Sequence, residues 1–407
     1  MLTIEPGRQR RAGGGKLAIA LAGGGPLGAF YELGVLHALE ETIVGRELTE
    51  FDVYVGVSSG SVVAAGLANG IDTTEMGSIF IHDTATILPL TPEILLHPAI
   101  GDYVRRAALL PEVLLEIGRS FARDPLRNGW PMAVSALGRA VPTAVFDNRP
   151  LERFLHAVFN GHDRTDDFRK LDSRLFVVAT NLNTGAALAF GDAAHDRVPI
   201  SRAVAASTAL PGLYAPVEID GEHYVDGALI RTMHASLALE AGCELVICVN
   251  PLVPFDGSRA SGPQHRNLAD AGLPVILGQT FRALIHSRMQ VGMASYRTRF
   301  PKADSLLFEP DRDDEKLFFA NVFRYAGRQG LVEHAYQRTR RDLRAQAAGL
   351  SAVLERHGLS LDLKRLRESG RSFSTSAMER AQRSRHATER LSRTLGSLEK
   401  TLSSMRR

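Results

Sequence analysis

LAIALAGGGPLGAFYELGVLHALEE, residues 17–41, runs from a strand-like apolar segment through three glycines into a helical pattern. Gly23, Gly25 and Gly28 satisfy the spacing G-x-G-x-x-G, which is typical of loops that hold a dinucleotide pyrophosphate at a helix N-terminus. The same loop could instead direct backbone N–H groups at another negatively charged group. The residues that follow the second predicted strand distinguish these two interpretations.

Strand-like and helix-like patterns alternate from about residue 16 to residue 251. Apolar runs typical of buried strands occur at residues 17–21, 53–55, 175–179 and 245–249. Helical patterns follow the first two of these runs. The alternation predicts an α/β fold with three layers, α/β/α, around a largely parallel central sheet.

The remaining segments suggest additions to this core. We expect a flexible N-terminus (1–15), an α/β domain (16–255), a helical extension (256–370) and a basic amphipathic tail (371–407). Residues 73–145 interrupt the α/β rhythm with leucines at helical spacing, which predicts inserted helices. Their apolar residues are either ordinary core or a cap over an apolar cleft.

The tail after residue 370 is rich in serine and arginine. It carries nine Lys/Arg against three Glu, a net charge of +6, and its leucines between Leu391 and Leu402 step by four and three as in a short coiled-coil seam. Two heptads do not decide the matter. A solvated tail, self-association as a homo-oligomer and contact with anionic lipid headgroups all remain open.

Composition excludes some classes of protein. The 407 residues are 44% hydrophobic and 23% charged, as in a soluble globular protein, and the net charge of +3 does not suggest a nucleic-acid partner. Only Cys243 and Cys248 are present, so no disulfide framework is expected. No secretory signal and no apolar run long enough to span a membrane are apparent. We therefore expect a cytoplasmic protein that could touch a membrane peripherally.

Residues 51–61, FDVYVGVSSGS, place a serine between a strand and a helix. Gly56, Ser58 and Gly60 form G-x-S-x-G directly after an apolar run and before a helix rich in small residues. A nucleophile elbow requires this context, because the turn is tight and the serine projects where helix N–H groups favour negative charge. We predict that Ser58 is a catalytic nucleophile; the alternative is a Gly/Ser turn that caps a helix.

A serine hydroxyl needs a base to take its proton, and the segment VEIDGEHYVDGALI offers one. Glu218–Gly221 is typical of a hairpin turn, with Asp220 as its turn residue, and a short strand then ends at Asp226. Because Gly227 follows, the Asp226 carboxylate can point into a cleft without crowding. Asp226 is therefore the candidate base, and a second turn aspartate is the alternative.

Several ordered segments between about residues 16 and 251 resemble those of a patatin-like phospholipase domain: GGGPLGAFYELGVLHAL, GVSSGS, NRPLERFL, ATNLNTG and AASTALPGLYAPVEIDGEHYVDGA. The resemblance covers roughly three-fifths of the chain. It implies a Ser–Asp dyad of Ser58 and Asp226, and a glycine-rich oxyanion loop of Gly23, Gly24 and Gly25. It implies no cofactor.

The resemblance also decides between the two interpretations of the first glycine loop. A dinucleotide fold needs an acidic residue at the far end of its second strand, but Glu50 and Asp52 precede that strand here. A phosphate-binding Walker loop needs a Gly-Lys-Ser/Thr that is absent. We therefore expect the glycines to direct amides at an oxyanion, with Pro26 excluded as a donor because it has no N–H.

Some residues depart from the family pattern. Leu27 stands where relatives often carry a cation, which favours neutral acylglycerols or lysolipids beside phospholipids. The aspartate motif is DGA, and no proline follows it within Leu229–His234. Histidines that follow Asp226 in the chain could in principle complete a triad, and none of these four lies in a recognisable loop motif: His234, His265, His286 and His334. No cluster has metal-ligand spacing.

The sequence therefore predicts a serine lipid acyl hydrolase that cleaves fatty-acyl esters through an acyl-enzyme. Amides of Gly24 and Gly25 are expected to stabilise the oxyanion. The lipid or acyl-ester substrate is the expected partner, with membrane contact through the insertion or the tail. An acyltransferase that uses the same site and a catalytically silent lipid-binding scaffold are the alternatives.

Overall fold

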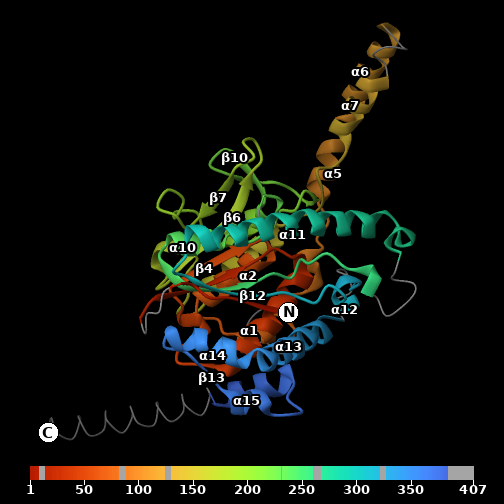
Figure 1. Ribbon diagram of the computed structural model, residues 1–407. Coiled ribbons are helices and arrows are strands. Elements are labelled where there is room, and N and C mark those ends of the chain that lie inside the picture. The colour runs from red at the N-terminus through yellow and green to blue at the C-terminus, as the bar shows by residue number, and fades with distance from the viewer. Residues whose placement is uncertain are drawn as a thin grey trace, which may run out of the picture.

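A nine-stranded sheet runs through the centre of the protein (Figure 1). The structure is a computed structural model that describes residues 1–8, 14–81, 89–123, 130–230, 232–259, 267–320 and 327–383. The strands follow the order β1-β12-β11-β2-β4-β6-β10-β9, with β7 paired to β6. Adjacent strands from β12 to β6 are parallel, whereas β1, β7, β9 and β10 pair in antiparallel fashion.

The strands of this sheet have the following bounds: β1 Leu2–Glu5, β2 Lys16–Leu21, β4 Val53–Val57, β6 Arg174–Asn181, β7 Ala187–Phe190, β9 Val217–Ile219, β10 Glu222–Asp226, β11 Cys243–Val249 and β12 Asp304–Phe308. Two small sheets pair β3 (Ile43–Val44) with β13 (Ser360–Leu361), and β5 (Ala144–Phe146) with β8 (Gly212–Tyr214).

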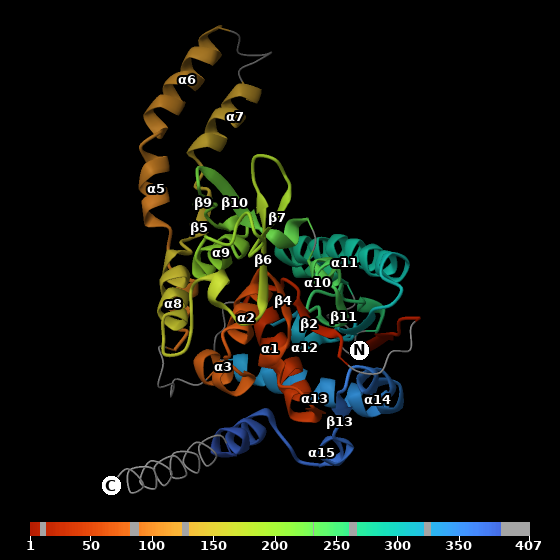
Figure 2. The ribbon, with the colours of Figure 1, turned by 90° about the vertical axis from the view of Figure 1, so that its left-hand side faces the viewer.

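Helices cover both faces of the central sheet (Figures 1 and 2). They have the following bounds: α1 Gly25–Thr42, α2 Ser59–Ala68, α3 Thr73–Phe80, α4 Pro92–Leu95, α5 Ile100–Ala107, α6 Leu110–Arg123, α7 Trp130–Ala140, α8 Arg149–Phe159, α9 Ile200–Ser207, α10 Ala235–Glu240, α11 Leu273–Arg299, α12 Glu315–Phe318, α13 Arg328–Ala345, α14 Ala347–Arg356 and α15 Leu363–Arg367. A further helical segment covers residues 373–383.

Two apolar cores flank the sheet because successive strand residues point to opposite faces. Along β2, Leu17, Ile19 and Leu21 belong to the larger core, which α1, α2, α9 and α13 also line. Ala18 and Ala20 belong to the smaller core, which α10 and α11 line on the other face. The α/β/α layering and the largely parallel sheet expected from the sequence are therefore confirmed.

The sheet extends beyond the predicted α/β domain (16–255) into both flanking segments. β1 lies within residues 1–15, which were expected to be flexible, yet it pairs along its length with β12. β12 lies within the predicted helical extension, yet it pairs with β11. A strand at the edge of a sheet exposes unpaired backbone groups. β12 covers the edge of β11, and β1 in turn covers the edge of β12.

The insertion contains the expected helices, but α5, α6 and α7 form an arm that projects from the body (Figure 2). This arm stands clear of the sheet and does not form a cap over it in this structure. Its root is tied down, because the N–H and hydroxyl of Thr143 donate to Asp102 at 2.7 and 2.9 Å. β5, which follows α7 in the chain, pairs with β8.

No helix among the described residues is both long enough and apolar enough to cross a membrane. The leucines of the predicted coiled-coil seam, from Leu391 to Leu402, lie outside the described residues.

Candidate active site

Ser58 occupies a sharp turn between β4 and α2. Its backbone has φ 52° and ψ −128°, a conformation that is strained for a residue with a side chain. The turn is closed by small residues: a Cβ on Gly56 would lie 2.4 Å from Ser61 Cα, and one on Gly60 would lie 2.7 Å from the Ala22 carbonyl oxygen. The predicted strand–serine–helix arrangement is therefore present, and the glycines are required by space.

Ser58 and Asp226 meet although 168 positions separate them in the chain. The Ser58 hydroxyl donates to Asp226 Oδ2 at 2.6 Å, and both residues are buried. The fold brings them together because Ser58 follows the end of β4, while Asp226 ends β10, which pairs with the last residues of β6. A Cβ on Gly227 would lie 2.3 Å from the Val178 carbonyl oxygen, so this position also requires glycine.

The Asp226 carboxylate is positioned by few hydrogen bonds. Its second oxygen, Oδ1, accepts the N–H of Ala228 at 2.8 Å, and its backbone N–H donates to the Ala209 carbonyl. Burial disfavours the charged form and raises the pKa of Asp226 to about 6, although the hydrogen bonds from Ser58 and Ala228 oppose this shift. A carboxylate with this pKa is a stronger base than an exposed aspartate.

Ser207 is a site residue to which the sequence analysis assigned no role. Its hydroxyl oxygen accepts the Ser58 N–H at 2.8 Å and its proton goes to the Val178 carbonyl at 2.6 Å. Ser207 thus joins the strained turn to β6. Its place within the quoted segment AASTALPG was the only available signal, because no local pattern identifies such a long-range contact.

The first glycine loop approaches Ser58 closely. A Cβ on Gly23 would lie 3.0 Å from Ser58 Cβ, and one on Gly24 would lie 2.5 Å from Pro251 Cγ. Gly25 has φ 62° and begins α1. The structure therefore places the predicted oxyanion loop beside the serine.

The three loop glycines differ in the use of their amides. The Gly23 N–H donates to the Thr232 carbonyl at 3.1 Å, so this donor is occupied, which departs from its predicted role. The N–H groups of Gly24 and Gly25 make no hydrogen bond to another described residue, as expected at a helix N-terminus. Gly28 closes the turn by donating to the Gly24 carbonyl. Of the three loop glycines, Gly24 and Gly25 thus keep a free donor at the start of α1.

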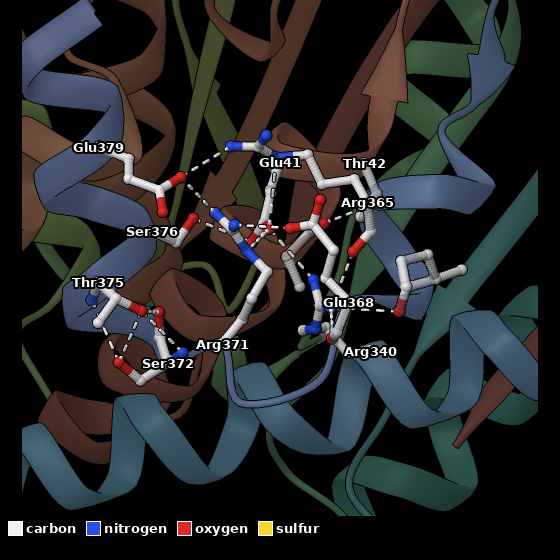
Figure 3. Close-up of polar contacts among 12 residues, drawn as sticks. Glu41, Thr42, Arg340, Arg365, Glu368, Arg371, Ser372, Thr375, Ser376 and Glu379 are labelled. Atoms are coloured by element: carbon white, nitrogen blue, oxygen red, sulfur yellow. Dashed lines mark hydrogen bonds and ion pairs between the residues drawn. The ribbon is translucent and has the colours of Figure 1, made fainter.

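The opposite end of α1 is bound by a dense ionic cluster (Figure 3). The Glu41 carboxylate accepts hydrogen bonds from Tyr336, from Arg340 at 3.2 Å and from Ser376 at 2.9 Å. The guanidinium groups of Arg365 and Arg371 also pair with it. We call these six residues the Glu41 cluster; it fixes the end of the helix whose first residues carry the free amides.

The described histidines do not complete a triad with the dyad. His286 lies 3.5 Å from Glu309, and His334 is 2.7 Å from Asp314. Among the described residues, the Asp226 carboxylate is hydrogen-bonded only to Ser58 and Ala228. His265 lies outside the described residues. The part of the chain that the structure covers also contains no group of His, Cys, Asp and Glu that could hold a metal ion.

Comparison with known proteins identifies the family of the chain. The family model for patatin-like phospholipase matches residues 19–239, more than half of the chain, and the chain belongs to this family. Among solved structures, it is similar to VipD from Legionella pneumophila (17% identity, TM-score 0.31, 61% of this chain and 52% of that one). It is also similar to the type III effector protein ExoU (16% identity, TM-score 0.31, 83% of this chain and 57% of that one). The chain thus spans little more than half the length of each.

Proposed function

We propose that the protein is a serine lipid acyl hydrolase in which Ser58 and Asp226 act as a catalytic dyad. The observation that carries this proposal is the 2.6 Å hydrogen bond between the Ser58 hydroxyl and a buried carboxylate. Membership of the patatin-like phospholipase family supports a fatty-acyl ester of a lipid as substrate. The glycine loop beside the serine supports acyl transfer chemistry, because this reaction develops negative charge on a carbonyl oxygen.

In the first half of the reaction, Ser58 Oγ attacks the acyl carbonyl carbon while Asp226 Oδ2 takes the hydroxyl proton. The tetrahedral intermediate then breaks its bond to the alcohol, which leaves with the proton from Asp226. The pKa of Asp226, raised to about 6 by burial, suits both steps, because the carboxylate is ionised near neutral pH and still accepts a proton readily.

The free amides of Gly24 and Gly25 would stabilise the oxyanion of this intermediate. One such donor is worth about 3 kcal/mol in the transition state when it is preorganised in a site that excludes water. The α1 dipole adds to this stabilisation, because the same two residues lie at the helix N-terminus. Gly23 contributes space for Ser58, not a donor.

In the second half, water attacks the acyl-enzyme and gives its proton to Asp226. The intermediate collapses, the fatty acid leaves and the proton returns to Ser58 Oγ. An alcohol that replaces water in this step would yield a new ester, so acyl transfer uses the same residues. Product analysis with competing alcohols separates the two outcomes.

The test is the turnover of p-nitrophenyl esters by Ser58→Ala, with Ser59→Ala as the matched control. The Ser59 hydroxyl, one residue away, makes no hydrogen bond in the described part of the chain. We expect Ser58→Ala to lose at least about 10³-fold in kcat and Ser59→Ala to keep most of its activity. Retained turnover in folded Ser58→Ala would falsify the proposal. A panel of phospholipids, lysophospholipids and acylglycerols then identifies the substrate class.

A further inference from the structure

The arm formed by α5, α6 and α7 exposes large apolar side chains along its length. Val104, Leu114 and Val141 are each at least 60% exposed. Five more large apolar residues of the arm and its root are at least 40% exposed: Ile100, Leu110, Leu115, Leu137 and Val145. A soluble protein seldom gathers so many exposed apolar side chains on one projection unless the projection contacts something.

Packing within the arm does not account for these residues. Val113, Ala133 and Ala136 are the buried apolar residues that α6 and α7 contribute among those whose exposure is described. Two helices side by side can cover only one face of each other, and the remaining faces stay open. The arm also stands clear of the body in both ribbon views, so the body does not cover them (Figures 1 and 2).

Two ion pairs on and near the arm hold an arginine further out than its carboxylate partner. In the pair at the arm root, the Arg105 side chain is 71% exposed while that of Asp102 is 6% exposed. The pair that follows β5 repeats this pattern, with Arg149 at 72% and Asp147 at 16%. The guanidinium groups therefore project outward, and their carboxylate partners are recessed.

A hollow at the arm root adds to this charge. Its volume is ≈ 550 Å³, and its lining includes His97, Arg149, Arg153 and Arg202 beside the exposed Ile100. Asp147 and Glu152 also line the hollow, where they pair with Arg149 and Arg202. Arg153 has no carboxylate partner among the described residues, and donates only to the Arg149 carbonyl oxygen. An apolar projection thus rises from a base that presents arginines.

We propose that this arm docks the protein on the surface of an anionic lipid bilayer. Apolar side chains of α5, α6 and α7 enter the interfacial region, and the arginines at the root and flanks contact lipid phosphates. Amphipathic helices with arginine beside an apolar face bind membranes in this way. A second copy of the chain would cover the apolar face equally well, but would not require outward arginines beside recessed carboxylates.

Docking would bring a lipid hydrolase to its substrate. In this respect alone, the inference rests on the proposed function. Docking itself is independent of turnover. The arm root is also near the site in the chain, because β8, which pairs with β5, begins five residues after Ser207. Docking therefore holds the bilayer in a fixed relation to the dyad.

Vesicle binding by the full chain tests the proposal. The Ser58→Ala protein is mixed with vesicles of phosphatidylcholine alone or with phosphatidylglycerol, so that no lipid is cleaved. We expect sedimentation with the anionic vesicles, reduced by high salt. Trp130, the only tryptophan in the sequence, is the first residue of α7. We expect brominated lipid in anionic vesicles to quench its fluorescence.

Paired variants locate the binding surface. Leu114→Asp with Leu115→Asp, again in the Ser58→Ala protein, is expected to weaken partitioning by about tenfold or more for each leucine replaced. The matched control is Leu363→Asp with Met378→Asp, which changes two exposed apolar residues at the opposite end of the molecule (Figure 1). We expect this control to bind as the parent does. Arg105→Gln with Arg153→Gln is expected to weaken binding to anionic vesicles and to lessen the salt dependence.

Docking and catalysis fail separately in this design. With Ser58 intact, Leu114→Asp with Leu115→Asp is expected to keep p-nitrophenyl butyrate turnover while losing hydrolysis of vesicle lipid. Absence of vesicle binding, equal binding by the arm and control variants, or bound protein with unquenched Trp130 would each overturn the docking proposal and leave the dyad untouched. Sedimentation equilibrium that shows the arm variant dissociating a dimer, with vesicle binding unchanged, would assign the arm to a second copy instead.

Discussion

The two ends of α1 differ in how their polar groups are paired. At its N-terminus, Gly24 and Gly25 keep amides without a partner among the described residues, and no side chain caps the helix. At its C-terminus, the Glu41 carboxylate is surrounded by three arginines, a tyrosine and a serine (Figure 3). One end leaves backbone donors unused, and the other surrounds a carboxylate with donors.

Each end of α1 contains an arrangement that is unfavourable for the folded state, but only one of the two is compensated. Acidic residues in the last turn oppose the helix dipole, so Glu41 needs its arginines for stability. Unpaired amides at the first turn also destabilise the folded state, but they provide donors for an oxyanion. Ser58 and Asp226 lie beside this first turn. The strained backbone of Ser58 and the burial of the Asp226 carboxylate are likewise unfavourable for the folded state. Changes at the two ends should therefore separate activity from stability.

The largest expected effect comes from Asp226→Asn, which keeps the shape of the site but removes the base. We expect kcat for p-nitrophenyl esters to fall about 10⁴-fold, as for the loss of a carboxylate that orients or takes a proton in serine hydrolases. Asparagine can still accept the Ala228 N–H, so the fold should persist. Residual activity within tenfold of the parent would contradict the role of Asp226.

The same variant should gain stability, with a pH dependence of defined sign. Burial raises the pKa of Asp226 from 3.8 to about 6, so the folded state holds this proton more tightly than the unfolded state. The parent therefore loses stability as pH rises from about 4 to 6, by about 3 kcal/mol in total. Asp226→Asn should melt higher than the parent at pH 8 and nearly equally at pH 4; thermal unfolding at both pH values measures this.

At the opposite end, Glu41→Gln should cost stability and not activity. Arg340, whose side chain is 1% exposed, would lose its carboxylate partner, and unpaired buried charge is costly. We expect the free energy of unfolding to fall by about 3 kcal/mol, measured by urea denaturation. Turnover per folded molecule should stay within about twofold of the parent. A selective loss of kcat would show that the two ends are not separable.

Gly25→Ala makes the complementary test at the first turn, where kcat should fall more than stability does. A Cβ at this position meets no atom within 4 Å, but φ is 62°, which disfavours alanine. We expect about 1 kcal/mol of lost stability and a fall in kcat of roughly 10- to 100-fold, because the amide of a preorganised donor shifts. Comparison of kcat with KM for a soluble ester distinguishes a displaced donor from weakened binding. An unchanged kcat would remove this amide from the oxyanion site.

The smallest effect is expected in the middle of the helix, at Glu32. Its carboxyl group is fully buried with no hydrogen-bond partner among the described residues, and burial raises its pKa well above the usual value. The parent therefore loses stability as pH rises above the ordinary glutamate pKa. Glu32→Gln should be near-neutral in activity and near-neutral in stability at acid pH, with a modest gain in Tm at pH 8. A lower Tm at pH 8 would show that the carboxylate has a favourable partner.

Local patterns predicted much of the structure around Ser58 and Asp226. The apolar run before Ser58, the small residues around it and the hairpin with Asp220 and Gly221 are signals over a few residues, and each element formed as expected. The position of Asp226 after a strand and before a glycine made it a candidate, and the fold brings its carboxylate to Ser58. The glycine loop could be located, but the engagement of the Gly23 amide by Thr232 depends on contact across 209 positions.

Other features depend on tertiary pairing and gave no local signal. β1 is a strand because β12 offers an edge, not because its four residues have a strong strand pattern. The arginines of the Glu41 cluster are spread over three segments, and only the fold brings them to one carboxylate (Figure 3). The arm could be predicted as helical, but its projection from the body depends on the ties at Thr143 and β5.

The rate at which a fluorophosphonate probe labels the protein, followed against pH with peptide mapping, tests the dyad most directly. We expect one labelled residue, Ser58, with a rate that rises as pH passes about 6 and then levels off, because Asp226 takes the proton only when ionised. In Asp226→Asn the labelling should be slow at every pH. Labelling at another serine, or a rate at Ser58 that ignores both pH and Asp226, would contradict the assignment of these two residues as nucleophile and base.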